Sequence, residues 1–310
     1  MSKENFASYA NSSEWADIQP IYLSEAETSI LKIISTPRFS EVFAYFRALI
    51  SKVEVSERAL LLTEDAVYLN PANYSVWYYR RFLLKELGKD FREELKFCSL
   101  MIKDTPKNYQ LWHHRKVLVE TLKDPTGELD FICSVLREDS KNYHAWQYRT
   151  WLVTQFNIWD GELDYSERMI CSDVRNNSAW NYRYFVINST TGFTESVVDK
   201  EMQFCFQWIR LVPNNESAWN YLSGIMVFVT PAGKSMAVEF CKSIQEGSEA
   251  YDDTPYNALL FLYDYWAEKY DSEKSASDKE SALEVCKRLK EVDPIRTQYY
   301  NFLKSTIEQG

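Results

Sequence analysis

The motif NYSVWYYR at residues 73–80 returns as NYQLWHHR at 108–115, NYHAWQYR at 142–149 and NNSAWNYR at 176–183. A fifth copy, NESAWNYL at 215–222, ends in Leu222 where the other copies end in arginine. The tryptophans of successive copies are 35, 34, 34 and 39 residues apart. A period of this length is typical of helical hairpins that stack into a solenoid.

Each copy predicts the beginning of a helix. An asparagine opens every copy, and its side chain can cap the first free amides of a helix. The tryptophan follows four residues later, and the residues ten and eleven positions after the asparagine are apolar in all copies. This spacing places the tryptophan on a buried helical face. The arginine at the end of the copy is expected to tie the helix to carbonyls or carboxylates of a neighbouring helix.

The segments between the copies have amphipathic spacing and the length of three or four turns, so each repeat predicts a helical hairpin. These segments are ERALLLTEDAVYL at 57–69, FREELKFCSLMIK at 91–103, LDFICSVLRED at 129–139 and ELDYSERMICSDV at 162–174. The tetratricopeptide pattern W-x-x-L-G-x-x-Y, which has the same period, is absent. We therefore predict an all-α fold, a right-handed solenoid or crescent of about seven helical hairpins.

The ends of the chain are less regular. Residues 1–55 predict an N-terminal arm with helices from about Ser24, and residues 56–310 a single solenoid domain whose part 231–310 is divergent. A sixth hairpin is expected over 231–270. A seventh is expected over SALEVCKRLKEVDPIRTQYYNFL at 281–303, with DSEKSASDKE at 271–280 as a solvated loop between the two.

Composition excludes several classes of function. The chain carries 35 Lys and Arg against 45 Asp and Glu, a net charge of −10, which disfavours binding to nucleic acid. Its 8 glycines form no dinucleotide, P-loop or nucleophile-elbow motif. The N-terminus lacks an apolar stretch of signal-peptide length, and no apolar run reaches the roughly 18 residues of a membrane span, so we expect a cytoplasmic protein.

The sequence predicts no metal site in this chain. The 6 cysteines contain no C-x-x-C pair, and we expect reduced thiols in the core. His113 and His114 are adjacent and point to different sides of a helix, and His144 has no H-x-x-x-H partner.

A cation precedes the capping asparagine in three consecutive repeats, although the positive end of a helix dipole disfavours a cation. A phosphate-like ligand would resolve this conflict, because a solenoid aligns equivalent positions along one rim. Taken singly, each cation is more often only a solvated side chain. The three rim segments are Lys107-Asn108-Tyr109-Gln110, Lys141-Asn142-Tyr143-His144 and Arg175-Asn176-Asn177-Ser178.

With these motifs the chain resembles the family of alpha subunits shared by protein farnesyltransferase and protein geranylgeranyltransferase type I. The similarity is carried by KNYQLWHHRKVLVETL at 107–122, KNYHAWQYRTWLV at 141–153, VRNNSAWNYRYFVI at 174–187 and VPNNESAWNYLSGI at 212–225. It extends to EWADIQP at 14–20 and DPIR at 293–296. Two departures are Leu222 in the fifth copy and Tyr300, where a tryptophan is usual after DPIR.

The resemblance implies an obligate heterodimer with a beta subunit, an alpha-alpha barrel that carries the catalytic zinc. The complex is expected to transfer a farnesyl or geranylgeranyl group from its diphosphate to the cysteine of a C-terminal CaaX sequence. Zinc would hold the attacking thiolate, and magnesium is expected for farnesyl transfer. The protein substrates would be CaaX-terminated proteins such as small GTPases.

The resemblance also implies roles for rim residues. Lys107 matches the lysine that contacts the diphosphate and offsets charge on the leaving group. Tyr109 matches a residue that lines the active site, and Gln110 matches the glutamine that binds the terminal carboxylate of the protein substrate. Residues Asn142, Tyr143 and His144 match the next rim segment, which faces the same cleft.

Two alternatives remain at this point. The alpha subunit of Rab geranylgeranyltransferase has similar repeats, but the segment around Gln110 favours the CaaX enzymes. A helical-repeat scaffold without chemistry would bind a peptide or protein on its concave face, and its rim lysines would be dispensable.

Overall fold

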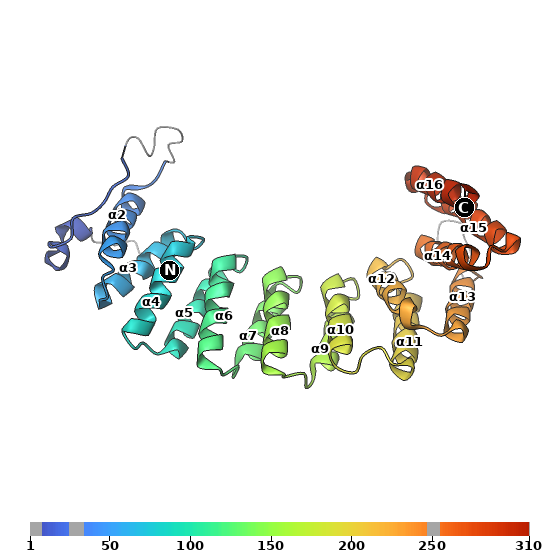
Figure 1. Ribbon diagram of the computed structural model, residues 1–310, viewed down its shortest axis with the longest axis horizontal. Coiled ribbons are helices and arrows are strands. Elements are labelled where there is room, and N and C mark those ends of the chain that lie inside the picture. The colour runs from blue at the N-terminus through green and yellow to red at the C-terminus, as the bar shows by residue number, and fades with distance from the viewer. Residues whose placement is uncertain (1–7, 25–33, 247–254, 310) are drawn as a thin grey trace. The chain divides into compact units, whose positions relative to one another are not determined.

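The computed structural model describes residues 8–24, 34–246 and 255–309, except for the side chains of residues 245 and 246. All regular secondary structure in these ranges is helical, which confirms the predicted all-α class (Figure 1). The chain divides into two compact units, Met1–Phe156 and Asn157–Gly310. The predicted single domain over 56–310 and its boundary at residue 55 stay predictions.

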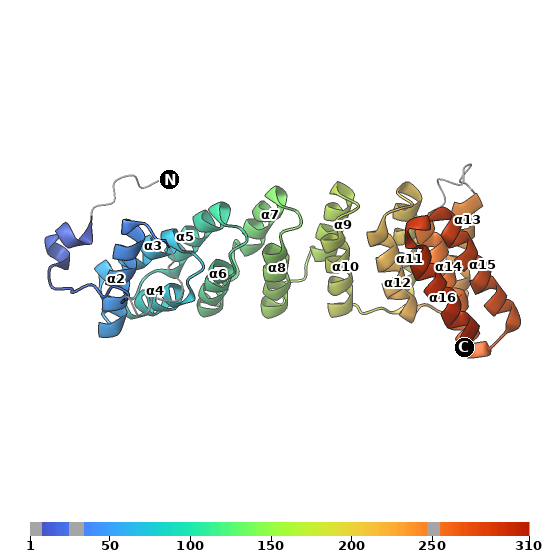
Figure 2. The ribbon, with the colours of Figure 1, turned by 90° about the horizontal axis from the view of Figure 1, so that it is seen from above.

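The first unit is built from helical hairpins. Helices α3 and α4, α5 and α6, and α7 and α8 pack as antiparallel neighbours, and α4, α6 and α8 pack against one another in order. Figure 2 shows α6 and α8 in one row and α5 and α7 in a second row. The elements are η1 (Tyr9–Asn11), η2 (Ser13–Trp15), α2 (Pro37–Lys52), α3 (Glu57–Leu69), α4 (Tyr74–Glu86), α5 (Phe91–Asp104), α6 (Tyr109–Leu122), α7 (Glu128–Glu138) and α8 (Tyr143–Phe156).

The second unit continues the same pattern, and its last two hairpins confirm the predicted sixth and seventh. Helices α13 and α14 form the sixth hairpin, and α15 and α16 form the seventh. The elements are α9 (Glu162–Ser172), α10 (Asn177–Ser189), α11 (Glu195–Leu211), α12 (Glu216–Ile225), η3 (Met226–Phe228), α13 (Pro231–Glu246), α14 (Tyr256–Glu273), α15 (Ala276–Val292), η5 (Pro294–Arg296) and α16 (Thr297–Gln309).

The prediction of a solvated loop at 271–280 is wrong. Helix α14 continues to Glu273 and α15 begins at Ala276, so the turn consists of Lys274 and Ser275. Lys274 adopts a left-handed conformation with φ of 51°, which ends α14 abruptly. Most of the charged residues that suggested a loop lie on exposed parts of the two helices, whereas Asp278 is buried and accepts a hydrogen bond from Lys269 at 3.2 Å.

The repeated asparagine and tryptophan play the same part in each of the five copies of the motif. The Asn108 side chain accepts hydrogen bonds from the amides of Gln110 (2.9 Å) and Leu111 (3.1 Å), as predicted for a cap. The tryptophan of each copy is buried, and its indole N–H donates to the carbonyl six residues earlier at 2.7 to 2.9 Å. The indole therefore closes the turn that precedes its own helix.

Buried ion pairs join the helices within and between hairpins, as expected for the repeated arginine. Arg115 on α6 forms two hydrogen bonds with Glu128 on α7, at 2.8 and 2.7 Å, and Tyr148 on α8 donates to the same carboxylate at 2.7 Å. The second unit repeats this arrangement around Glu201, with Arg183 and Tyr221. One buried carboxylate thus joins three helices.

The two departures from the family pattern are accommodated in the core. Leu222 is fully buried. Tyr300 is also buried, and its hydroxyl donates to Asp293 at 2.5 Å while Arg296 binds the same carboxylate at 2.7 Å. Tyr300 therefore takes part in a carboxylate cluster like those of the repeats.

The cysteines are all free thiols, as predicted, but they are not all in the core. Cys98, Cys205, Cys241 and Cys286 are buried, Cys133 is half-buried, and Cys171, near the end of α9, is exposed. The expected helices from about Ser24 fall partly on residues 25–33, which lie outside the described residues.

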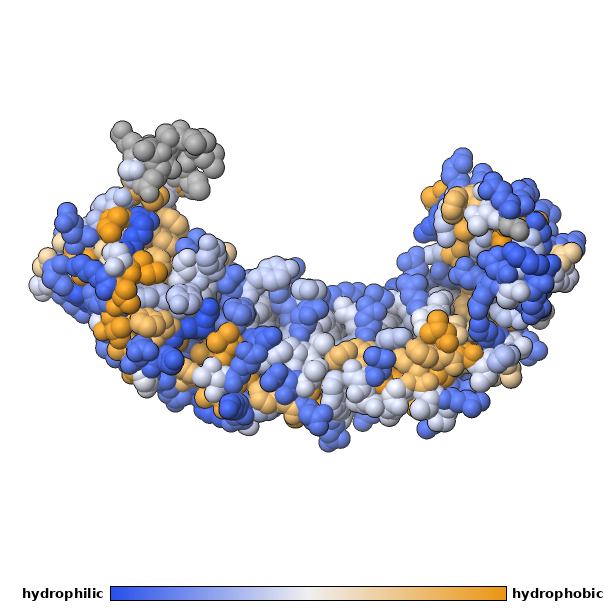
Figure 3. Space-filling model, viewed as in Figure 1, coloured by the Kyte–Doolittle hydropathy of each residue, from blue (hydrophilic) through white to orange (hydrophobic). Residues whose placement is uncertain are grey.

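Part of the surface of each unit is apolar. Hydrophobic side chains gather over α11 and α12 in the second unit (Figure 3). The exposed large apolar residues of this region are Leu211, Val227 and Phe228. Over the described residues, no helix has both the length and the apolar character needed to cross a membrane.

Candidate active site

The backbone that carries Lys107 is held by two repeats of the first unit. The carbonyl of Pro106 accepts hydrogen bonds from the Trp112 indole (2.9 Å) and from the Asn142 side chain (3.3 Å). His144 forms a further hydrogen bond with the backbone of Lys107. The Lys107 side chain is exposed and makes no ion pair with any described residue. A free ammonium group therefore extends from a fixed backbone.

Lys107 differs from the other two rim cations in its immediate surroundings. The carboxylate of Asp139 accepts the backbone amide of Lys141 at 3.2 Å, and an aspartate likewise binds the amide of Arg175 at 2.9 Å. The corresponding residue before Lys107 is Thr105, whose hydroxyl is neutral. Lys107 is thus the rim cation whose charge is compensated least by its neighbour two residues earlier.

Three aromatic side chains lie beside this lysine. The ring of Tyr109 meets the ring of His144 edge to face, with centroids 4.2 Å apart, and Tyr143 lies 5.5 Å from His144. Tyr109 and Tyr143 are 68% and 59% exposed, whereas His144 is buried. Burial lowers the pKa of His144, opposed by its hydrogen bond to the backbone of Lys107. His144 is therefore a neutral support on which Tyr109 rests.

The side chain of Asn142 is buried and fully used within the chain. Its carbonyl oxygen accepts the amide of Ala145 at 3.0 Å, and its N–H group donates to Pro106. Asn142 thus caps α8 and also links it to the turn before Lys107. Its predicted role in substrate binding stays a prediction.

Gln110 faces a different part of the first unit. It lines a pocket of about 460 Å³ between α4 and α6 that does not include Lys107, Tyr109, Tyr143 or His144. The structure therefore brings the lysine and three aromatic residues together and places Gln110 beside them, toward α4. The sequence analysis did not identify this pocket, whose lining residues are Ile50, Tyr74, Ser75, Tyr78, Arg81, Gln110 and His113.

The repeats match a known family. The signature described as protein prenyltransferase alpha subunit repeat matches residues 56–87, 91–122, 125–156, 159–190 and 198–228. These ranges contain helices α3 to α12, apart from the first residues of α11. The second range contains the rim segment of Lys107, and the third contains that of His144. The chain belongs to the protein prenyltransferase alpha-subunit family.

Relatives of this prenyltransferase alpha subunit are similar over almost its whole length. A protein of Solanum lycopersicum named protein farnesyltransferase/geranylgeranyltransferase type-1 subunit alpha is 39% identical, over 95% of this chain and 89% of the relative. A Dictyostelium discoideum protein of the same name is 34% identical, over 98% and 95%. These names confirm the predicted family, that of the farnesyltransferase and geranylgeranyltransferase type I subunits.

A solved structure of the family has the same fold. The structure of Candida albicans protein geranylgeranyltransferase-I complexed with GGPP matches with a TM-score of 0.84 and 28% sequence identity, and the match covers 99% of this chain and 100% of that chain. The fold prediction is thus supported by an independent comparison as well as by the helices.

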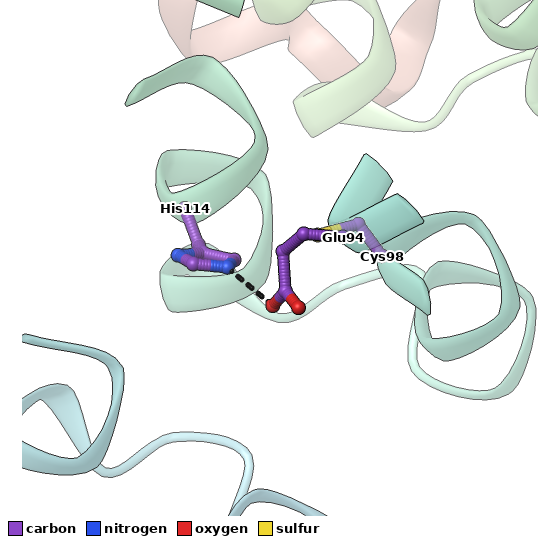
Figure 4. A group of neighbouring side chains, drawn as sticks. All are labelled: Glu94, Cys98 and His114. Atoms are coloured by element: carbon purple, nitrogen blue, oxygen red, sulfur yellow. Dashed lines mark hydrogen bonds and ion pairs between the residues drawn. The ribbon is translucent and has the colours of Figure 1, made fainter. Parts of the chain in front are cut away.

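Among the described residues of this alpha subunit, one group of potential metal ligands occurs, but it does not suit zinc. Donor atoms of Glu94, Cys98 and His114 lie within 4.8 Å of one another (Figure 4). Arg80 binds both oxygens of Glu94 at 2.7 Å, so a cation already neutralises this carboxylate. Burial raises the pKa of Cys98, which keeps the thiol protonated. Zinc binds thiolate sulfur, neutral imidazole nitrogen and free carboxylate oxygen. Here the thiol is protonated, and the Nε2 atom of His114 is already hydrogen-bonded to Glu94 at 2.8 Å.

Proposed function

We propose that this chain acts with a beta subunit to transfer a farnesyl or geranylgeranyl group from its diphosphate to the cysteine of a C-terminal CaaX sequence. The observation that carries the proposal is the exposed, unpaired Lys107 on a backbone held by Asn142 and His144. Family membership and the similarity to a geranylgeranyltransferase complexed with GGPP support an isoprenoid diphosphate as the ligand.

In this reaction the cysteine sulfur forms a bond to C1 of the isoprenoid while the C1–O bond breaks. The diphosphate leaves with the electron pair of the broken bond, so negative charge grows on its bridging oxygen. The ammonium group of Lys107 stabilises this charge, and it needs little reorganisation because its backbone is already fixed. Tyr109 and Tyr143 would flank the diphosphate, and Gln110 would bind the carboxylate of the protein substrate.

Zinc in the beta subunit and magnesium remain part of this proposal through the resemblance. A zinc ion at the site would lower the pKa of the substrate thiol and so supply a nucleophile at neutral pH. The resemblance assigns the zinc to the partner, and in the described part of this chain the carboxylate of the candidate ligand group binds Arg80 instead of a metal. We also expect the enzyme in the cytoplasm, with small GTPases that end in CaaX among its substrates.

The test is transfer of labelled farnesyl and geranylgeranyl diphosphate to a CaaX peptide, with the chain alone and after co-expression with each candidate beta subunit. Activity that requires co-expression supports the proposal, and the lipid accepted with each partner identifies which subunit selects it. A stable heterodimer that transfers neither lipid to CaaX peptides but modifies Rab proteins would instead identify a Rab enzyme. A heterodimer inactive on both substrates would favour a scaffold.

A further inference from the structure

A groove lined with basic and aromatic residues runs between α4 and α6 of the first unit. It joins the Gln110 pocket of about 460 Å³ to a second pocket of about 290 Å³, because Tyr78 and Arg81 line both. We call it the Arg81 groove. From Tyr74 to Lys85 it follows α4 for about 16 Å, at 1.5 Å per residue.

The charge of the groove has one sign. Its ionisable groups other than tyrosines are Arg81, Lys85 and His113, and none of the described residues that line it is Asp or Glu. This is unusual in a chain with a net charge of −10. The groove is thus a local basic surface on an acidic protein, and it is complementary to an acidic group.

Arg81 lacks the partner that its location requires. One nitrogen of its guanidinium group, Nη1, is buried and has no hydrogen-bond partner among the described residues. The neighbouring Arg80, by contrast, binds Glu94 through two hydrogen bonds of 2.7 Å. Burial lowers the pKa of Arg81. Arg81 as a whole is half-buried. A partly desolvated guanidinium group without an anion is costly, and a carboxylate is the ligand that fits its fork geometry.

The remaining walls of the groove indicate a protein as its occupant. Tyr74 and Tyr78 at the rim are 72% and 67% exposed, and the far end is lined by apolar groups of Phe82, Phe91 and Val117. Exposed tyrosines around a poorly solvated arginine are the composition of interface hot spots. The end of a substrate chain at Gln110 would occupy only one end of a groove of this length.

We propose that the Arg81 groove receives an Asp or Glu side chain of the beta subunit, carried on an apolar segment, and that this ion pair anchors the heterodimer. The arginine donates to both carboxylate oxygens, Tyr74 and Tyr78 cover the pair, and the apolar segment fills the end near Phe82. The inference rests on the beta subunit of the proposed function. The contact is separate from the chemistry assigned to Lys107, so a failed exchange test leaves the proposed transfer reaction standing.

The first experiment measures subunit exchange in the purified heterodimer. Pre-formed heterodimers that carry the alpha variants Arg81→Gln, Arg81→Lys or Arg92→Ala are mixed with an excess of labelled unmodified alpha subunit. Arg92 is the matched control, because it is an exposed arginine of the same unit that pairs with Asp124. We expect Arg81→Gln to increase the exchange rate about 30-fold or more, Arg81→Lys less, and Arg92→Ala less than twofold. Exchange of the Arg81→Gln heterodimer at the unmodified rate overturns the proposal.

A second measurement separates the beta subunit from the peptide substrate as the source of the carboxylate. The Michaelis constants of peptides that end in a free carboxylate and in a carboxamide are compared for the Arg81→Gln enzyme. If the Michaelis constant rises only for the free-acid peptide and the subunit exchange rate is unchanged, Arg81 binds the substrate and the proposal is overturned.

A third measurement does not depend on removing the arginine. A photo-crosslinking phenylalanine analogue replaces Tyr78 in the heterodimer, and the linked peptides are sequenced. Crosslinks to a beta-subunit segment that contains Asp or Glu support the assignment. Crosslinks confined to the peptide substrate, or to beta segments without an acidic residue, contradict it.

Discussion

The Nε2 atom of His114 lies 2.8 Å from a carboxylate oxygen of Glu94, at the repeat position where other copies place a tyrosine. Tyr148 and Tyr221 donate to Glu128 and Glu201 at 2.7 Å, and in each case the two residues are 20 positions apart, as are His114 and Glu94. The imidazole thus replaces a phenol as the third member of a buried carboxylate cluster.

We expect His114→Tyr to preserve this cluster, because the hydroxyl can donate to Glu94 as in the other repeats. The Tm of the heterodimer should change by less than about 3 °C, whereas His114→Ala leaves a cavity and an incompletely bonded carboxylate and should lower it by about 4 °C or more. Thermal unfolding followed by circular dichroism distinguishes the two variants. Equal losses would show that the hydrogen bond to Glu94 has no importance for stability.

Acidification should destabilise the protein in two stages. Burial lowers the pKa of His114 below its usual 6.5, so below that pH the unfolded chain binds a proton that the folded chain does not, and stability falls. Burial alone would raise the pKa of Glu94, but the hydrogen bonds from His114 and Arg80 lower it from 4.5 to about 2. Its contribution is complete above pH 4.5 and is lost as the pH falls toward 2.

The first stage can be assigned with a variant. Between pH 7 and 5.5, His114→Tyr should show a smaller decrease in Tm than the unmodified heterodimer. The decrease should not vanish, because burial also lowers the pKa of His113 and His144. An identical decrease in both proteins would contradict the role of His114.

Removing the ammonium group of Lys107 should slow transfer and leave folding intact. We expect Lys107→Ala to lower kcat about 10²- to 10³-fold, because its charge acts mainly on the leaving diphosphate in the transition state. The control is Lys103→Ala, which removes another exposed lysine of the same repeat and should change kcat less than twofold. Single-turnover transfer to a CaaX peptide measures both, and an unchanged rate for Lys107→Ala would eliminate the proposed role.

Asn142 should affect activity through the position of Lys107. Asn142→Ala removes a helix cap and the hydrogen bond to Pro106, which should cost about 1–3 kcal/mol and lower kcat as the turn loosens. Asn215 is the matched control. It caps α12 and donates to Val174 at 2.7 Å in the second unit.

Asn215→Ala should therefore lower the Tm by a similar amount and leave kcat unchanged. If both variants change kcat equally, the loss at Asn142 reflects general destabilisation and not the position of Lys107.

Leu222→Arg should destabilise the second unit, although it restores the residue of the other repeats. Glu94 and Glu201 each precede a buried cysteine by four residues, and the corresponding residue before Cys241 is Ala237, which is fully buried. The new arginine would be buried without a carboxylate to bind, which should lower the free energy of unfolding by about 3–5 kcal/mol. The double variant with Ala237→Glu should recover part of the Tm, and a single variant as stable as the unmodified protein would contradict this account.

The hairpins could be predicted because each depends on contacts within about 15 residues. The Asn108 cap, the Trp112 indole and the amphipathic segments act locally, so their spacing is visible in the sequence. The loop at 271–280 was predicted wrongly for the same reason. Charged residues are compatible with a loop or a helix, and the choice depends on packing of α14 against α15, which buries Asp278 beside Lys269.

The conflict of a cation with the helix dipole marked Lys107, Lys141 and Arg175 in the sequence, and the family resemblance selected Lys107 among them. The surroundings of Lys107 could not be predicted. The contacts of Asn142 and His144 with the turn before Lys107 cross from one repeat to the next and exist only when the hairpins stack. The surroundings of Arg81 are even less visible in the sequence. The adjacent Arg80 has the same side chain and binds Glu94, whereas one nitrogen of Arg81 has no partner among the described residues.

The sequence by itself therefore determined the period, the helices, the caps and the family, since periodic local interactions specify all of them. Only the tertiary structure decided which carboxylate each arginine binds, that Asn142 is buried, and that Gln110 faces α4 and not the rings beside Lys107. The physical reason is that burial and ion pairing depend on distances between side chains that are remote in the chain. Those distances are set when one hairpin packs on another.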